Sequence, residues 1–338
     1  MEATYQIFNE DCIAGIRSRL KPDSVHLTVT SIPFEELFTY SGKLEDVGNN
    51  GSSMDVRAGR FCLNMRFAID ALHWVHAQGT NVCIHLQTLL AYKNQHGFMG
   101  RRDFRGAMIE AFTAGGFHWI GEVVIPKDPQ QMAQRLNLHS LQFKTGKKRD
   151  ANNLAPAIND YVLIFQKPGQ SPAPVRCIRE RDENPGGWIT TEDWIKWASG
   201  VWDDILQIDV LDDWRSARET DTEKHVCPLQ LELIRRFVML YTNPISVQPD
   251  VTVLDPFMGI GSTAHVCLGG PTCQNAVVNE PRNVIGFELK ESYFAQAMRN
   301  AERAKSQEKR RERQDRPLLG FGEDEIETEV EVEMDELV

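Results

Sequence analysis

The sequence predicts an α/β protein built on an open, mostly parallel β-sheet. Short runs of β-branched and apolar residues, typical of strands, alternate along the chain with amphipathic stretches typical of helices. This alternation is the pattern of βαβ units, whose strands pair in parallel beneath helices. The chain has 338 residues, of which 41% are hydrophobic and 25% charged, so it can bury a large core.

The first half of the chain supplies most of the predicted strands. Tyr5–Phe8 is a short apolar run, and Val25–Thr30 is a run rich in β-branched residues. The remaining predicted elements are helices over Ile13–Leu20, Met65–Ala77 and Arg105–Ala114, and strands over Asn81–Leu86, Phe117–Ile125 and Tyr161–Phe165. Residues 41 to 59, rich in Gly, Ser and Asn, are expected to form a surface loop.

The second half begins with a stretch of different composition, residues 169 to 222. It holds five tryptophans, most of which we expect to form a small core: Trp188, Trp194, Trp197, Trp202 and Trp214. A helical pattern from Leu229 to Leu240 follows, and then the strand Val251–Leu254. A helix from Thr263, a strand over Asn283–Phe287 and a last helix from Ser292 to about Arg313 complete the predicted elements.

Charge and cysteine content restrict the class of protein. The net charge is -11, but residues 322 to 338 carry nine acidic side chains and no basic one, so the rest of the chain has about -2 (-11 + 9). We expect this acidic tail to be disordered, and a less favoured hypothesis is that it covers a binding channel as an electrostatic mimic of an anionic ligand. Seven cysteines without a CxxC pair predict reduced thiols and no metal site. No apolar stretch is long enough to span a membrane, which predicts a cytoplasmic protein.

A glycine-rich loop follows the strand that ends at Leu254. It runs from Asp255 to Thr263 and carries Gly259 and Gly261 just before a helix, which lets backbone approach a ligand at the helix N-terminus. Glu288 ends the next strand, where its carboxylate could accept hydrogen bonds from both ribose hydroxyls of a nucleoside cofactor. The alternative is that Gly259 and Gly261 are ordinary turn residues and Glu288 is a surface acid. That alternative is favoured for a lone glycine pair, but the two flanking strands and the acid favour a cofactor site.

A dinucleotide site is the second alternative, because the loop formally satisfies the GxGxxA pattern with an acid downstream. In the dinucleotide fold several strands follow that loop, whereas 75 residues (338 - 263) follow Thr263 here. Asp255 also suits a cationic, amino-bearing cofactor such as S-adenosylmethionine better than a pyrophosphate, which a carboxylate repels. We therefore expect S-adenosylmethionine, with an NAD-dependent oxidoreductase as the weaker alternative.

A second constellation, Ser31-Ile32-Pro33-Phe34, stands at the carboxyl end of a strand, where ligands bind in open α/β sheets. Here the sequence resembles the DNA amino-methyltransferases, whose catalytic loop reads Asp, Asn or Ser, then Pro-Pro, then Tyr or Phe. The resemblance covers most of residues 4 to 303. Its order, with catalytic loop first, variable module next and cofactor loop last, resembles the permuted beta group.

The resemblance implies the S-adenosylmethionine-dependent methyltransferase fold, with seven strands, helices on both faces and an inserted recognition module. It divides the chain into a catalytic half at 1–168 with a basic insertion at about 127–157, a target-recognition module at 169–222, a cofactor half at 223–305 and a charged tail at 306–338. The catalytic residues that it implies are Ser31, Ile32, Pro33 and Phe34. The cofactor-binding residues are Asp255, Pro256, Phe257, Gly259, Gly261, Ser262, Thr263 and Glu288.

The implied reaction is methyl transfer to an exocyclic amino group of a DNA base. By analogy, the Ser31 hydroxyl and the Ile32 carbonyl accept the amine hydrogens, while Phe34 stacks on a flipped base. Ile32 stands where the family has its first proline, so the loop lacks the fixed φ of proline. This difference supports an alternative, a catalytically degenerate protein that only binds DNA or S-adenosylmethionine. The serine favours cytosine N4 over adenine N6. The chain has no Pro-Cys dipeptide, which disfavours ring-carbon methylation.

The expected partner is double-stranded DNA, in a bacterial or phage setting, with a homodimer as an open alternative to a monomer and no metal. Two basic groups are candidates for phosphate contacts, and solvated loops are an equal alternative. They are Lys144, Lys147, Lys148 and Arg149 in the basic insertion, and Arg101, Arg102 and Arg105 before it.

Overall fold

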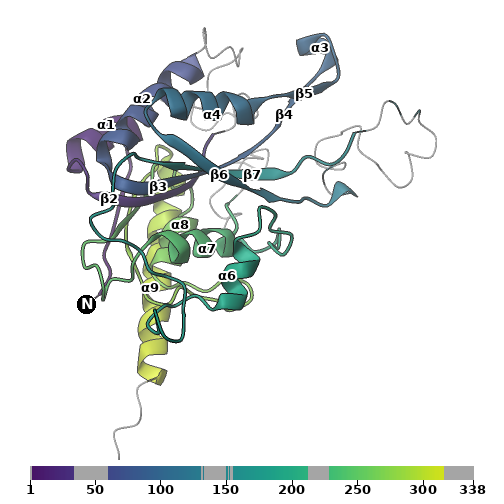
Figure 1. Cartoon of the computed structure of the whole chain (residues 1–338). Coiled ribbons are helices and arrows are strands. Elements are labelled where there is room, and N and C mark those ends of the chain that lie inside the picture. Colours follow the sequence, from purple (N-terminus) through teal and green to yellow (C-terminus); the bar gives the residue numbers. More distant parts are fainter. Residues whose placement is uncertain are drawn as a thin grey trace, which may run out of the picture.

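The computed structural model describes residues 2–33, 60–130, 132, 150, 152, 155–211 and 228–315. In chain order the elements are β1 (Tyr5–Phe8), α1 (Cys12–Arg19), β2 (Val25–Ser31), α2 (Arg60–Val75), β3 (His76–Gln87), β4 (Leu89–Ala91), α3 (Lys93–His96), β5 (Gly100–Arg102), α4 (Phe104–Ala114), β6 (His118–Ile125), β7 (Asp160–Gln166), α6 (Thr191–Trp197), α7 (Leu231–Tyr241), β8 (Thr252–Asp255), α8 (Ser262–Cys267), β9 (Asn283–Phe287) and α9 (Glu291–Asp315). Figure 1 shows their arrangement.

A seven-stranded sheet in the order β1-β9-β8-β2-β3-β7-β6 forms the centre of the molecule. Neighbours from β1 to β3 pair in parallel, and β7 is antiparallel to both β3 and β6. This confirms the predicted mixed, mostly parallel sheet. The middle strand β2 is buried at every position from Val25 to Thr30, as a strand covered on both faces must be.

Helices cover both faces of the sheet, as predicted. In Figure 1, α1, α2 and α4 lie on one face, and α7, α8 and α9 lie on the other. Side chains of β3 alternate between the two cores: Val82 and Ile84 pack with α2 and α4, whereas Cys83 packs with the core that includes Phe237 of α7. The two cores hold the carboxyl ends of the parallel strands in fixed positions.

The predicted elements agree with the observed ones, with shifts at their ends. The predicted helix over Met65–Ala77 ends at Val75, because His76 already pairs with Val25 of β2. No pattern in the sequence indicated the antiparallel hairpin of β4 and β5 with α3 at its tip, which projects from the body in Figure 1. Its strands have three residues each, too few for a period of two to be recognised.

Tryptophans of the 169–222 stretch behave as core residues in part. Trp202 and Trp197 are buried, and Trp188 packs against the same core, whereas Trp194 is 39% exposed. Trp202 is joined to the sheet through backbone hydrogen bonds between residues 200–202 and Val124 of β6. This stretch therefore shares a core with the sheet instead of enclosing one of its own.

Several predictions lie outside the described residues: the loop at 41–59, Phe34, Trp214, the cluster Lys144, Lys147, Lys148 and Arg149, and the acidic tail. Among the described cysteines, Cys12, Cys83, Cys177 and Cys267 are buried free thiols and Cys273 is an exposed one. In the ranges that the structure describes, no helix combines the length and the apolar character needed to cross a membrane.

Candidate active site

The two predicted motifs meet at one edge of the sheet. β2 ends at Ser31 and β8 ends at Asp255, and these strands pair directly in parallel, with Thr28 opposite Leu254. β9 pairs with the other side of β8, with Gly286 opposite Asp255, so Glu288 follows at the same edge. Parallel pairing therefore gathers Ser31, Asp255 and Glu288 where open α/β sheets bind ligands.

Asp255 joins the two motifs through hydrogen bonds. Its Oδ1 accepts from the Thr30 hydroxyl at 2.6 Å and from the Phe257 amide at 3.0 Å, and its Oδ2 accepts from the Thr263 hydroxyl at 2.7 Å. The side chain is buried, and burial raises the pKa of Asp255 although these hydrogen bonds oppose that shift. Thr30 directly precedes Ser31, so Asp255 fixes the end of β2 relative to the glycine-rich loop.

The two glycines of the loop have different roles. Gly261 has φ +92°, and a Cβ atom there would lie 3.0 Å from Cα of Ala297 in α9, so only glycine fits without strain. Gly259 has φ +55°, and a Cβ atom there would face open space. Gly261 therefore packs α8 against α9, whereas Gly259 leaves one side of the loop open to a ligand.

Glu288 is oriented by main-chain amides. Its Oε2 accepts from the Gly259 amide at 2.8 Å, and its Oε1 accepts from the Lys290 amide at 2.8 Å. These two bonds fix the direction of the Glu288 carboxylate beside the glycine-rich loop. The glycine-rich loop and the acid after β9, which the sequence places 29 residues apart, are thus one unit.

The remaining cofactor-binding candidates lie in the same unit. Pro256, Ser262 and Thr263 are buried, and Phe257 is half-buried. Thr263 donates to Asp255 and also lies 3.3 Å from the Val29 carbonyl of β2. The structure thus brings all eight candidates together.

At the end of β2, the Ser31 side chain contacts a histidine that the sequence patterns did not single out. The Ser31 hydroxyl lies 2.9 Å from Nδ1 of His85, whose Nε2 lies 3.0 Å from Oδ2 of Asp160. Lys127 pairs with the same Oδ2 at 2.6 Å, and Gln87 donates to Oδ1 at 3.0 Å. A polar residue inside the predicted apolar strand Asn81–Leu86 was the signal that could have identified His85.

The isoleucine that replaces the family's first proline has a structural use. Ile32 is buried, with 2% of its surface exposed, and its amide donates to the His85 carbonyl at 3.3 Å. Proline has no amide hydrogen and could not make this bond, which extends the pairing of β2 with β3 by one residue. Pro33 is also buried, and Phe34 lies outside the described residues.

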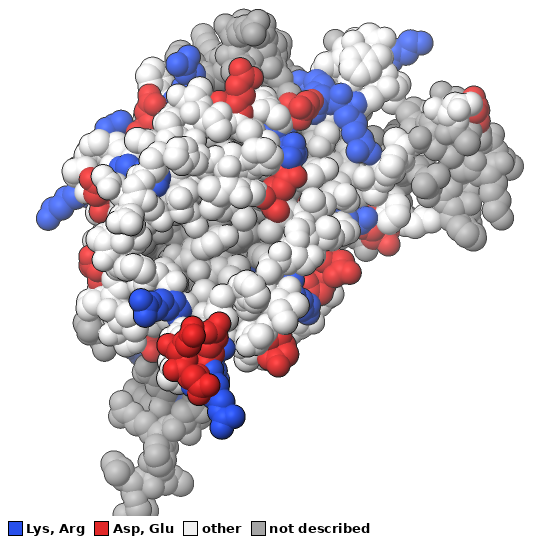
Figure 2. All heavy atoms as spheres, in the orientation of Figure 1, with Lys and Arg blue, Asp and Glu red and all other residues white. Residues whose placement is uncertain are grey.

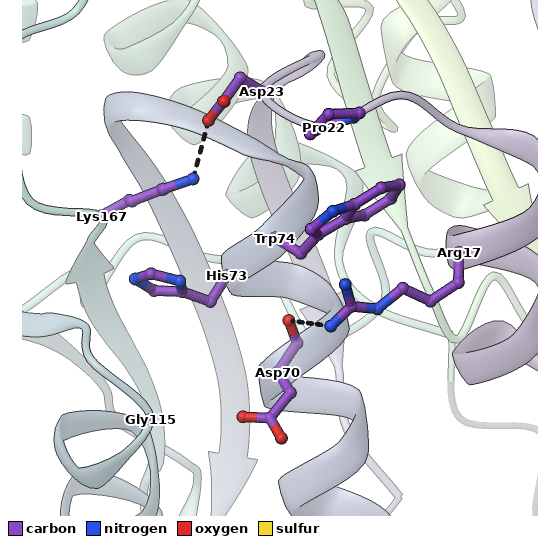
Figure 3. Close-up of a pocket in the computed structure, with 8 residues that line it drawn as sticks. All are labelled: Arg17, Pro22, Asp23, Asp70, His73, Trp74, Gly115 and Lys167. Carbon is purple, nitrogen blue, oxygen red and sulfur yellow. Dashed lines mark hydrogen bonds and ion pairs between the residues drawn. The ribbon is translucent and has the colours of Figure 1, made fainter.

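A surface pocket at the opposite end of the sheet is shown in Figure 3. Pro22 and Asp23 before β2 and Lys167 after β7 line it, together with residues of α1 and α2. Lys167 pairs with Asp23 at 2.8 Å, so its charge is already balanced. This pocket lies at the amino ends of the parallel strands, away from Ser31, Asp255 and Glu288.

The basic residues of the first half are not equivalent. Arg105 pairs with Glu122 at 2.6 Å and stacks near Trp119, so it is held against the body. Arg101 is exposed on β5 and its guanidinium donates to the Pro156 carbonyl, whereas Arg102 is half-buried and donates to the Leu90 carbonyl at 3.3 Å. Figure 2 shows Lys and Arg side chains gathered at the projecting hairpin.

Comparisons with known proteins identify the family of the chain. A DNA methylase family model matches residues 97–299. The Type II methyltransferase M.BglI of Bacillus subtilis is 30% identical over 144 residues, which are 42% of this chain and 30% of that protein, so the matched part spans less than a third of that relative.

Two solved structures share the fold. One is TTHA0409 of Thermus thermophilus, described as a candidate DNA modification methylase and complexed with S-adenosyl-L-methionine. It has a TM-score of 0.58 and 18% identity, and the match covers 90% of this chain and 94% of that chain. The PvuII DNA methyltransferase, described as cytosine-N4-specific, has a TM-score of 0.55 and 16% identity over 92% of this chain and 93% of its own.

Proposed function

Because the chain belongs to the DNA methylase family, we propose that it transfers a methyl group from S-adenosylmethionine to an exocyclic amino group of a base in double-stranded DNA. The observation that carries this proposal is the junction at Asp255. One buried carboxylate accepts hydrogen bonds from the strand of the catalytic loop, through Thr30, and from the helix of the cofactor loop, through Thr263. A methyl donor and an acceptor base held by these two loops would share one edge of the sheet.

The residues present fit S-adenosylmethionine. Glu288 is held beside the glycine-rich loop and is an acceptor of the kind that binds ribose hydroxyls, and Gly259 leaves an open side where a nucleoside can approach the backbone. Asp255 places a carboxylate at this loop, where it would repel an anionic ligand such as a pyrophosphate and suit a cationic one. When bound, S-adenosylmethionine supplies an electrophilic methyl group, whose carbon bonds to the amine nitrogen while the carbon–sulfur electron pair stays on sulfur.

The catalytic loop supplies hydrogen-bond acceptors for the amine. An exocyclic amine is a poor nucleophile because its lone pair is delocalised into the ring. The Ser31 hydroxyl and the Ile32 carbonyl would accept its two hydrogens, which localises that pair and aims it at the methyl carbon. Phe34, the next residue but one, would stack on the flipped base.

We propose cytosine N4 as the target and adenine N6 as the alternative. Serine at the first position of the catalytic loop supports cytosine, as does the fold shared with a methyltransferase described as cytosine-N4-specific. Residues 169–222 would recognise the DNA sequence, and Arg101 and Arg102 on the projecting hairpin, with the basic cluster at 144–149, would contact phosphates.

One experiment tests the reaction and the base together. The protein is incubated with labelled S-adenosylmethionine and mixed-sequence duplex DNA, and the DNA is digested to nucleosides. We expect label in N4-methyldeoxycytidine. Label in N6-methyldeoxyadenosine refutes the choice of base, and the absence of label with wild-type protein refutes the proposed reaction. A titration with NAD separates the dinucleotide alternative, which predicts NAD binding.

A matched pair of variants tests the catalytic loop. Ser31→Ala removes the hydroxyl beside the amine and should lower the methylation rate with little effect on cofactor affinity. Ser24→Ala removes a hydroxyl that bonds the Lys21 carbonyl just before β2, at the opposite end of this strand, and should leave the rate unchanged. Equal rates for both variants contradict the role of Ser31.

A further inference from the structure

Four side chains from separate elements form a continuous hydrogen-bonded chain that begins at Ser31. The hydroxyl of Ser31 on β2 contacts Nδ1 of His85 on β3 at 2.9 Å, and Nε2 of His85 contacts Asp160 on β7 at 3.0 Å. Lys127, two residues after β6, contacts the same Asp160 oxygen at 2.6 Å. His85 and Asp160 are buried, with 8% and 5% of their surfaces exposed, whereas Ser31 is half-buried.

The charge of Asp160 sets the direction of these hydrogen bonds. Burial raises the pKa of Asp160, but the adjacent His85 and Lys127 outweigh burial and lower that pKa below its usual value. An ionised carboxylate can only accept, so Nε2 of the imidazole carries the hydrogen. When the ring is neutral, Nδ1 is the acceptor and the Ser31 hydroxyl donates to it, so the lone pairs of the Ser31 oxygen are directed away from His85.

We propose that His85 and Asp160 act through Ser31 as a relay that removes the proton released when the target amine is methylated; this inference rests on the proposed function. As the amine nitrogen gains the methyl group, one of its protons passes to the Ser31 oxygen and the Ser31 hydroxyl proton passes to Nδ1 of His85. The resulting imidazolium is stabilised by Asp160 and later releases its proton to solvent. No oxidant or further reactant is needed.

The surroundings of His85 support a relay over a purely structural role. The charged groups that face it are Asp160 from β7 and Lys127 from the segment after β6. On the β2 side it contacts the uncharged hydroxyl of Ser31, whereas Asp255 on β8 is bonded to Thr30 and Thr263. The relay therefore combines a hydroxyl toward the substrate with a carboxylate behind the ring, and the hydrogen bond to Asp160 fixes the tautomer and orientation of His85.

A second histidine on β3 provides the matched control. His76 is buried at the start of the strand, where its ring contacts the hydroxyls of Thr28 at 2.8 Å and Thr80 at 3.0 Å. Its two ring nitrogens thus contact hydroxyls and not a carboxylate, and burial lowers the pKa of His76 to about 3, so its ring stays neutral. It has the same residue type, strand and hydroxyl contact as His85, but it lies at the end of β3 away from Ser31.

The test compares single-turnover methylation rates across pH for wild type, His85→Gln, Asp160→Asn and His76→Gln. We expect His85→Gln to lower the rate about 10²–10⁴-fold, the range for losing general-base assistance. The pH profile of the wild-type rate should be altered in His85→Gln and retained in His76→Gln. Affinity for S-adenosylmethionine, measured by calorimetry, should be unchanged in all variants.

Two outcomes overturn the relay while leaving the proposed function intact: a His85→Gln rate and pH profile equal to wild type, or the same loss in His76→Gln. Absence of transfer by the wild type refutes the proposed function itself. Nitrogen-15 NMR of wild-type protein without cofactor gives a readout that depends on neither variant folding nor activity. We expect His85 to show a protonated Nε2 and an unprotonated Nδ1, and the opposite tautomer overturns the relay.

Discussion

Replacing the two loop glycines by alanine should separate packing from ligand access. At Gly261, alanine at φ +92° incurs backbone strain of about 1–3 kcal/mol, and contact with Ala297 at 3.0 Å adds overpacking of about 1–3 kcal/mol. Alanine also restricts the unfolded chain, which offsets about 0.4–1 kcal/mol of this loss. Gly261→Ala should therefore lower the free energy of unfolding by about 3 kcal/mol. At Gly259, φ +55° lies in the left-handed region and no atom obstructs the new methyl, so the net cost should be about 1 kcal/mol or less.

Cofactor affinity should follow the opposite order. The added methyl of Gly259→Ala would enter the open side of the loop, next to the amide that orients Glu288, and should weaken S-adenosylmethionine binding more than its small stability cost suggests. Urea unfolding without cofactor gives the free energy of unfolding for both variants, and calorimetry gives the affinity of the folded proteins. Equal stability losses, or wild-type affinity in Gly259→Ala, would refute this interpretation of the loop.

Three further predictions concern a carboxylate, a buried ring and a basic side chain. Burial raises the pKa of Asp255 in the folded protein, so its stabilising contribution is present below the unfolded pKa of about 3.9 and is lost as pH rises through the folded pKa. In urea unfolding, the stability of wild type relative to Asp255→Asn should therefore fall with rising pH. A stability difference that is independent of pH contradicts this prediction. Trp202→Ala should cost about 3–5 kcal/mol in the same assay, whereas Trp194→Ala, at an exposed site, should cost much less. Arg101→Ala should reduce the slope of log DNA affinity against log salt concentration by about one phosphate contact. Arg105→Ala should leave this slope unchanged, because its guanidinium is paired with Glu122. Equal slopes for the two variants argue against the hairpin as a DNA contact.

Local patterns in the sequence were sufficient for most of the fold. The sheet, its parallel part and the helices of both faces follow from alternation of short apolar runs with amphipathic stretches, and those runs coincide with β1 to β3 and β6 to β9. The hairpin of β4 and β5 and helix α6 were missed because each is too short to establish a period. The antiparallel placement of β7 depends on strand order, which no run of residues specifies on its own.

The sequence by itself determined the chemistry at the ends of the strands. Gly259 and Gly261 before a helix, with an acid at the end of each of two strands, predict a nucleoside cofactor, and the resemblance of Ser31-Ile32-Pro33-Phe34 to a catalytic loop of the family implies an amine-binding loop. These features are readable because each motif is a short local pattern at the end of a strand.

Only the tertiary structure decided which of these groups act together. Asp255 bonds Thr30 across 225 positions of sequence, and His85 joins Ser31 and Asp160 across 54 and 75. Such contacts arise because β8, β2, β3 and β7 are neighbours in the sheet, an order set by packing of the whole chain. A lone histidine in an apolar strand carries no mark of its partners, so its place behind Ser31 became visible only when the strands were assembled.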